Sequence, residues 1–141
     1  TPMKYPAKLT KDEDGFVITF RDIPEAITQG DTHNEAMEMA EDALLTAMDF
    51  YFEDNRQVPL PSKPKKDEVL RNLPVSVATK VMLLNTLLEK GVTQAELAKL
   101  MGIRPQQVTR IVNLEHTTKI DTVEKAFRAL GRELDIAVAM A

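Results

Sequence analysis

The chain has 141 residues, of which 43% are hydrophobic and 28% charged, with a net charge of −4 and no cysteine. It is long enough for one large or two small domains, and without cysteine it has neither disulfides nor cysteine-bound metals. Its two histidines argue against a histidine-rich metal site. No apolar run approaches the ~18 residues of a membrane span and nothing resembles a signal peptide, so we expect a cytoplasmic protein with no membrane partner and no cofactor. Thr1 and Pro2 have the character of a cloning remnant, and we expect the natural chain to start at Met3.

Charge is divided unevenly along the chain. Residues 1–60 carry 5 Lys and Arg against 13 Asp and Glu, a net of −8, whereas residues 61–141 carry 13 against 9, a net of +4. A basic half suits a phosphate backbone, because bound cations release condensed counterions. An acidic half is repelled by DNA and suits a basic protein surface. We therefore expect the two halves to have different partners.

An α+β domain, with a small antiparallel sheet and one covering helix, is predicted over residues 3–56. Residues 4–9 and 16–20 predict a hairpin, because turn residues separate them, and residues 26–28 predict a short third strand. A T-x-x-E pattern that starts at Thr32 is typical of a capping box. Behind it, seven apolar residues repeat at helical spacing, which predicts a helix of about five turns against one face of the sheet.

Four carboxylates of this domain could be imagined as the metal-binding set of an enzyme: Asp12, Asp14, Asp22 and Glu25. They lie in a predicted turn and near a strand end, where carboxylates usually serve turns and solubility. Two-metal chemistry needs ligands that converge on ions ~4 Å apart, and nothing in this spacing requires that. We expect no enzyme.

Aromatic and acidic side chains meet at the end of the predicted helix, at Phe50, Tyr51, Glu53 and Asp54. They could form an aromatic anchor ringed by acid that binds a basic partner. The alternative, which we favour, is that these aromatics close the core of the domain.

Residues 57–72 are predicted to be a linker. The stretch from Val58 to Lys66, VPLPSKPKK, has three prolines and three lysines. It can neither continue a helix nor pair well as a central strand, so we expect a semi-extended segment with solvated lysines.

Residues 73–141 predict a helical domain centred on a helix-turn-helix. A wide apolar stripe over residues 77–88 indicates its first helix. A second T-x-x-E pattern, at residues 93–96, opens the next helix. Gly102 can end that helix in a left-handed conformation, and Pro105 can start another without losing a needed hydrogen bond.

The second helix of the motif, residues 105–113, has an outer face suited to reading DNA. Val108, Ile111 and Val112 repeat at helical spacing and must face the partner helix, which leaves the polar residues outside. Arg can bond guanine and Gln can bond adenine in a major groove. The polar residues of this face are Gln106, Gln107, Thr109, Arg110 and Asn113. The alternative is an ordinary helical hairpin with polar residues outside.

Six positions of the motif have the Gln, apolar, small, Gly and two apolar residues of a known pattern: Gln94, Leu97, Ala98, Gly102, Val108 and Ile111. In this the motif resembles the lambda-repressor-like helix-turn-helix class. The resemblance implies that Gln94 contacts a phosphate and that the polar outer face reads bases. Arg104 and Lys119 complete the predicted DNA-contacting set, whereas His116 is about as well explained by a solvated loop.

A last helix at residues 120–130 and a last strand at residues 134–138 are predicted after the motif. A single strand needs partners for its amide groups. The corresponding strand of a second subunit is a plausible partner, and a two-fold dimer is what most helix-turn-helix repressors need to read two half-sites.

The order of short motifs along the chain is specific. K-Y-P opens it, D-I-P-E-A stands at residues 22–26, A-L-L-T-A at residues 43–47 and P-L-P-S at residues 59–62, before the helix-turn-helix. Over residues 3–138 this order resembles HicB-type antitoxins.

That resemblance implies a partial RNase-H-like N-terminal domain that neutralises a small basic toxin, HicA, which cleaves messenger RNA. It also implies a C-terminal domain that dimerises, or forms a larger oligomer, and represses the operon by binding operator DNA. The aromatic and acidic residues at 50–54 then become candidate toxin contacts. The alternative is a repressor whose N-terminal domain senses a small ligand, which would call for a pocket with convergent polar groups.

Overall fold

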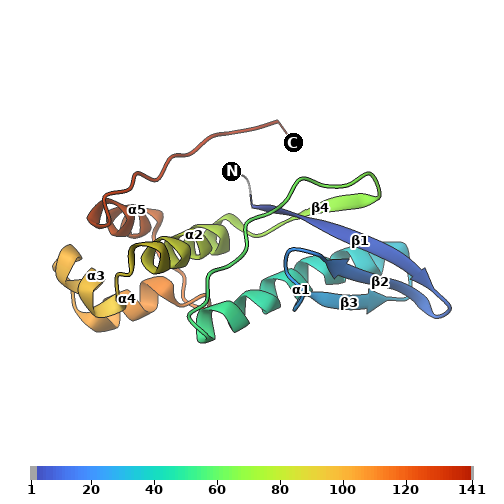
Figure 1. Cartoon of the computed structure of the whole chain (residues 1–141), viewed down its shortest axis with the longest axis horizontal. Helices are drawn as coiled ribbons and strands as arrows, with labels where there is room; N and C mark the ends of the chain where they lie inside the picture. The colour runs from blue at the N-terminus through green and yellow to red at the C-terminus, as the bar shows by residue number, and fades with distance from the viewer. Residues whose placement is uncertain (1–2, 141) are drawn as a thin grey trace. The chain divides into compact units, whose positions relative to one another are not determined.

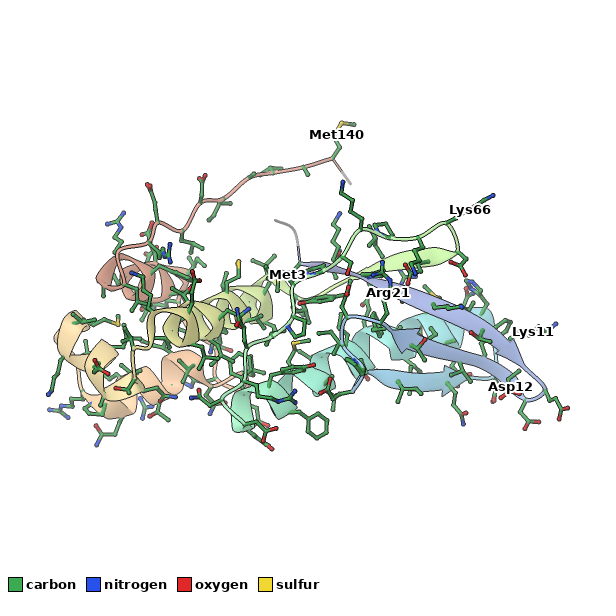
Figure 2. The ribbon with its side chains drawn as sticks, viewed as in Figure 1. Met3, Lys11, Asp12, Arg21, Lys66 and Met140 are labelled. Atoms are coloured by element: carbon green, nitrogen blue, oxygen red, sulfur yellow. The ribbon has the colours of Figure 1, made fainter. Side chains whose placement is uncertain are left out.

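In the computed structural model, which describes residues 3–140, the predicted hairpin is present as β1 (Lys4–Asp12) and β2 (Gly15–Phe20). β3 (Ile27–Gly30) pairs with the other edge of β2, close to the predicted third strand. All pairs are antiparallel, and Ala7 lies opposite Phe20 so that both turn to the core. Figure 2 shows the turn between β1 and β2, beside Asp12, at the tip of the hairpin.

α1 (His33–Glu53) covers one face of this sheet, as the apolar spacing predicts (Figure 1). The Oγ1 of Thr32 accepts a hydrogen bond from the Glu35 N–H at 3.1 Å, which caps the first turn. Gly30 lets the helix approach β3 closely, since a Cβ there would lie 2.5 Å from the Ala36 nitrogen. The α+β class of the first part is therefore confirmed.

β4 (Glu68–Asn72) is a strand that the sequence does not predict. It pairs antiparallel with the free edge of β1, with Lys4 opposite Asn72, and completes the strand order β3-β2-β1-β4. Its side chains are mostly exposed and do not alternate clearly, so the sheet recruits it through backbone hydrogen bonds. The last five residues of the predicted linker thus lie in the sheet.

The remainder of that predicted linker packs on the first part of the chain. Val58 is buried, and the Tyr5 hydroxyl donates to the Pro59 carbonyl at 2.7 Å. The Asp22 carboxylate accepts hydrogen bonds from both the backbone N–H, at 2.9 Å, and the hydroxyl of Ser62. Arg21, labelled in Figure 2, donates to the Lys63 carbonyl at 2.5 Å. The burial of Val58 and these hydrogen bonds therefore hold the proline-rich segment against the first part of the chain.

The chain divides into two compact units between Ala78 and Thr79. α2 (Val75–Lys90) starts at the end of the first unit and continues into the second. The second unit then has α3 (Gln94–Met101), α4 (Pro105–Val112) and α5 (Ile120–Ala129), as predicted.

The core of the second unit is formed by apolar faces of all four helices. Its buried members are Leu83, Leu87, Leu97, Ala98, Val108, Ile111, Val112, Val123, Ala126, Phe127 and Leu130.

The predicted C-terminal strand at residues 134–138 is wrong for the described chain. Residues 132–140 run as an extended tail, with Met140 near its end (Figure 2). Ile136 and Val138 are 74% and 98% exposed. Within residues 3–140 the sheet has four strands and none of them lies in this tail, so its backbone groups have no ladder to join. Ala141, the last residue of the predicted domain, lies outside the described residues.

Residues 3–140 lack two features. No group of three or more His, Cys, Asp or Glu side chains there is placed to hold a metal ion. No helix in the same range combines the length and the apolar character needed to cross a bilayer.

Candidate functional site

The helix-turn-helix is built by hydrogen bonds that the sequence encodes locally. At the start of α3 the capping box is complete: the Glu96 N–H donates to Thr93 Oγ1 at 3.1 Å, and the Thr93 N–H donates to Glu96 Oε1 at 3.2 Å. At its end Gly102 has φ +68°, and the next N–H, of Ile103, bonds the Ala98 carbonyl at 3.0 Å. The left-handed residue turns the chain toward α4, which begins at Pro105.

α4 presents one face to the core and the other to solvent. Val108, Ile111 and Val112 are buried, and α3 supplies the small residue Ala98 to the same cluster, which lets the two helices approach closely. This confirms the predicted inward face of the second helix.

A buried lysine fixes the C-terminal end of α4. Lys80, on α2, is 3% exposed, and its ammonium group donates to the backbone carbonyls of Arg110 at 3.4 Å and Asn113 at 2.6 Å, and also to that of His116. A cation at a helix C-terminus interacts favourably with the helix dipole. Burial lowers the pKa of Lys80. The sequence shows no sign of this contact, because Lys80 stands 30 residues away from Arg110.

All eight residues of the predicted DNA-contacting set lie exposed on the second unit: Gln94, Arg104, Gln106, Gln107, Thr109, Arg110, Asn113 and Lys119. Gln94 is the first residue of α3, and Lys119 is the N-cap of α5. The set therefore occupies the surface of the helix-turn-helix and the loop that follows it.

Three of these side chains also make local hydrogen bonds. Gln107 Oε1 accepts from the Arg104 N–H at 3.0 Å at the start of α4. The Thr109 hydroxyl donates to the Pro105 carbonyl at 3.2 Å, four residues earlier. These bonds orient the two side chains but leave the Gln107 amide NH₂ as a donor. The Asn113 Oδ1 accepts from the Glu115 N–H at 2.9 Å in the turn after α4.

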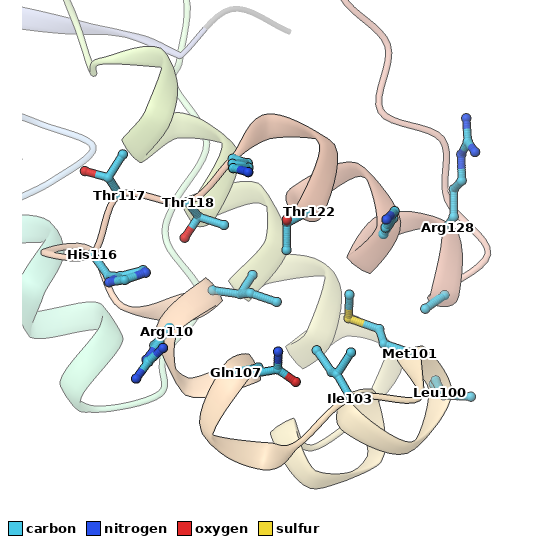
Figure 3. Close-up of a pocket in the computed structure, with 14 residues that line it drawn as sticks. Leu100, Met101, Ile103, Gln107, Arg110, His116, Thr117, Thr118, Thr122 and Arg128 are labelled. Atoms are coloured by element: carbon cyan, nitrogen blue, oxygen red, sulfur yellow. The ribbon is translucent and has the colours of Figure 1, made fainter.

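A groove of about 800 Å³ lies between α4, the loop after it and α5 (Figure 3). Arg110 and Gln107 line it from α4, and the apolar residues Met101 and Ile103 line it beside the turn. Its ionisable lining residues within the described chain are Arg110, His116, Lys119, Lys125 and Arg128, with no carboxylate among them. The groove can therefore hold an anion against α4.

Lys125 and Arg128 are the cationic residues of this groove that the sequence does not predict as DNA contacts. They project from the side of α5 opposite its buried residues Val123, Ala126 and Phe127. Their spacing of three on an amphipathic helix is a signal that could have been noticed. Arg128 also pairs with Glu124 at 3.5 Å on the surface of the same helix.

The candidate partner contacts at the end of α1 separate into two kinds. Phe50 is 50% exposed, and Glu53 and Asp54 are exposed as well. Tyr51 is 2% exposed and belongs to the core of the first unit, so we remove it from the candidate contact set. Its side chain points inward because it continues the buried stripe of α1.

The hydroxyl of Tyr51 ties α1 to the segment between β2 and β3. It donates to Glu25 Oε1 at 2.5 Å, and Arg56 donates to the other oxygen at 3.1 Å. The Arg56 guanidinium also lies 4.2 Å from the centre of the Tyr51 ring. Burial and the Glu25 carboxylate raise the pKa of Tyr51 to about 12.

Comparison with known proteins decides the family. Residues 4–82 match the family described as the HicB-like antitoxin of bacterial toxin–antitoxin systems. "Antitoxin HicB 2" of Photorhabdus laumondii is 54% identical over 95% of this chain and 95% of its own length. The chain belongs to the HicB antitoxin family.

Other HicB relatives extend the match across both units. "Antitoxin HicB" of Escherichia coli K12 is 53% identical over 96% of this chain and 99% of its own length. "Antitoxin HicB" of Pseudomonas fluorescens is 43% identical over 92% of this chain. Residues 84–136 match a helix-turn-helix family, so this HicB protein carries a helix-turn-helix of the DNA-binding type. HicB proteins are antitoxins and not enzymes.

Proposed function

We propose that this HicB protein binds and inhibits a HicA-type toxin with its first unit and represses its own operon with its second. The second unit binds operator DNA as a dimer, or within a higher oligomer, formed through the C-terminal domain. The observation that carries the proposal is the presence, in one HicB-family chain, of an acidic α+β unit and a helix-turn-helix with a cationic groove beside it.

The second unit suits DNA in two ways. Arg110 and Gln106 stand exposed on α4, where they can donate hydrogen bonds to base edges in a major groove. Lys119 and Lys125, in the groove beside α4, can neutralise phosphates next to the bases that are read. Base contacts supply the sequence preference, and phosphate contacts supply affinity and register.

The first unit suits a basic protein. α1 has six Asp and Glu and neither Lys nor Arg. Such a surface repels DNA and attracts a partner of opposite charge, which raises the rate of association. The acidic first half and the basic second half of the chain therefore suit different partners, a basic protein and DNA.

Growth provides the test of toxin inhibition. The small basic protein that we expect to be encoded beside this chain is expressed alone and together with the full chain. We expect growth arrest with the small protein alone, and rescue and co-purification with the full chain. If the neighbour is not toxic, or the chain does not bind it, a repressor with a small-ligand sensor becomes the better account.

Operator binding tests the second activity through Arg110→Ala. We expect a loss of ~1–3 kcal/mol on the operator, concentrated at one base position, because a bidentate base contact is removed. The matched variant Gln94→Ala removes a phosphate contact and is expected to weaken binding to all sequences about equally. Binding to an operator library by both variants distinguishes the roles. A uniform loss for Arg110→Ala would make it a phosphate contact instead.

A further inference from the structure

A second groove lies on the first unit, between α1 and the edge strand β3. Its volume is about 300 Å³. Three large apolar residues line it and are nevertheless exposed: Ile27 is 63%, Met39 41% and Phe50 50% exposed. We call this site the α1–β3 groove. Three exposed apolar residues around one hollow are more than scattered surface hydrophobics explain.

The helix shows why these residues remain uncovered. The buried stripe of α1 includes Ala40, Leu44 and Ala47, which meet the sheet. A second stripe of α1 lines the groove, and each of its members precedes a buried residue by one position. Its members are Met39, Ala43, Thr46 and Phe50. This second stripe lies beside β3, the outermost strand on that side of the sheet, and Ile27 and Thr28 of β3 line the same groove.

β3 adds an open backbone edge to the same surface. Its neighbour in the sheet is β2, and its other edge pairs with no strand of the described chain. Edge strands with free N–H and C=O groups readily bind another chain. The α1–β3 groove therefore combines apolar side chains with a hydrogen-bonding rim.

Charge indicates the kind of partner. Two carboxylates line the α1–β3 groove, and no Lys or Arg lines it within residues 3–140. Glu25 is engaged by Tyr51 and Arg56, whereas Asp42 is exposed on α1. An exposed carboxylate beside an apolar hollow favours a partner that presents Lys or Arg next to an apolar side chain.

We propose that the α1–β3 groove is the surface on which the basic toxin docks, with Met39 and Phe50 as the apolar centre and Asp42 as the charge contact. This inference rests on the proposed function, because it names the binding surface for the toxin. The apolar centre supplies affinity once water is excluded from it, and Asp42 selects a cationic partner.

Two pairs of matched variants test the groove in the full chain. Phe50→Ala removes an apolar side chain from it, and Leu60→Ala removes one of similar exposure, 60%, that does not line it. Asp42→Lys reverses a charge in the groove, and Glu41→Lys makes the same reversal at the neighbouring position of α1, outside the lining. Calorimetry measures binding to the small basic protein encoded beside the chain.

We expect binding weaker by about tenfold or more for Phe50→Ala and Asp42→Lys, and by less than about threefold for the two controls. All four variants should keep the circular dichroism spectrum, the melting temperature and the operator affinity of the wild-type chain. Those readouts separate a lost contact from a lost fold.

Three results would overturn the inference. If the wild-type chain binds the toxin and each groove variant binds as well as its control, the toxin docks elsewhere while the proposed function stands. If Asp42→Lys and Glu41→Lys weaken binding equally, general attraction to the acidic helix accounts for the charge effect. A wild-type chain that binds no neighbouring basic protein would remove the proposed function and this inference together.

Discussion

Glu25 illustrates how one carboxylate joins two elements of the first unit. Its oxygens accept hydrogen bonds from Tyr51 and Arg56, and these partners lower the pKa of Glu25 below the usual value of a glutamate. Because the folded state has the lower pKa, the ionised carboxylate stabilises the fold above the ordinary pKa. That contribution is lost as the pH falls through the pKa of the folded state.

Glu25→Gln should therefore destabilise the chain by about 1 kcal/mol at neutral pH, and the difference should shrink as the pH falls below about 4. Chemical denaturation of both proteins across this range measures it. Glu38→Gln, which removes an exposed carboxylate from α1, is the control and should show little effect at any pH. A Glu25→Gln difference that is the same at pH 7 and pH 3 would contradict the hydrogen-bond account.

Lys80 is a single buried residue that holds the C-terminal end of α4. Lys80→Met keeps the aliphatic stem but leaves the carbonyls at the end of α4 without their cation. We expect a loss of about 2 kcal/mol in the free energy of unfolding, together with weaker operator binding. Lys90→Met, at the exposed end of α2, should change stability by less than about 0.5 kcal/mol. Equal stability of the two variants would show that the buried contacts contribute nothing.

At the scale of elements, α5 has a buried face and a cationic face. Its buried side completes the core of the second unit, while Lys125 and Arg128 line the groove beside α4. If Lys125 contacts a phosphate, Lys125→Gln reduces the slope of log K against log salt concentration by about 0.9. Arg132→Gln removes a cation outside the groove and is the control. An unchanged slope for Lys125→Gln would exclude α5 from the DNA interface.

β4 and the segment before it show the limit of composition as a guide to elements. Prolines and lysines indicate a chain that avoids helices and central strands, and this holds for residues 57–67. The segment is nevertheless fastened by Tyr5, Asp22 and Arg21, which come from other parts of the unit. Such contacts join residues 40 to 54 positions apart, and no local pattern reports them.

At the scale of the whole molecule, the C-terminal tail exposes apolar side chains that no part of the described chain covers. The tail has three exposed large apolar residues that alternate with alanines: Ile136, Val138 and Met140. Removal of residues 135–141 should convert the proposed dimer to a monomer, because the truncated chain lacks the apolar side chains that we expect to pack against a second chain. Light scattering at micromolar concentrations measures the mass. A truncated chain that remains dimeric would place the contact on the helices.

Local sequence by itself determined both capping patterns, the hairpin, the long covering helix and the inward and outward faces of α4. These features depend on side-chain period and on hydrogen bonds between residues three or four positions apart, which can be read in one stretch. The family resemblance also rested on short motifs in order, and the comparisons confirm it.

Tertiary structure alone decided the rest. It added β4 to the sheet, left Phe50 on the surface, placed Lys80 under the end of α4 and left the tail without a strand partner. Each of these outcomes depends on which distant groups meet, since a strand needs a second strand and a buried charge needs acceptors. Sequence period specifies the face a residue occupies within its element, and only the folded chain specifies what that face meets.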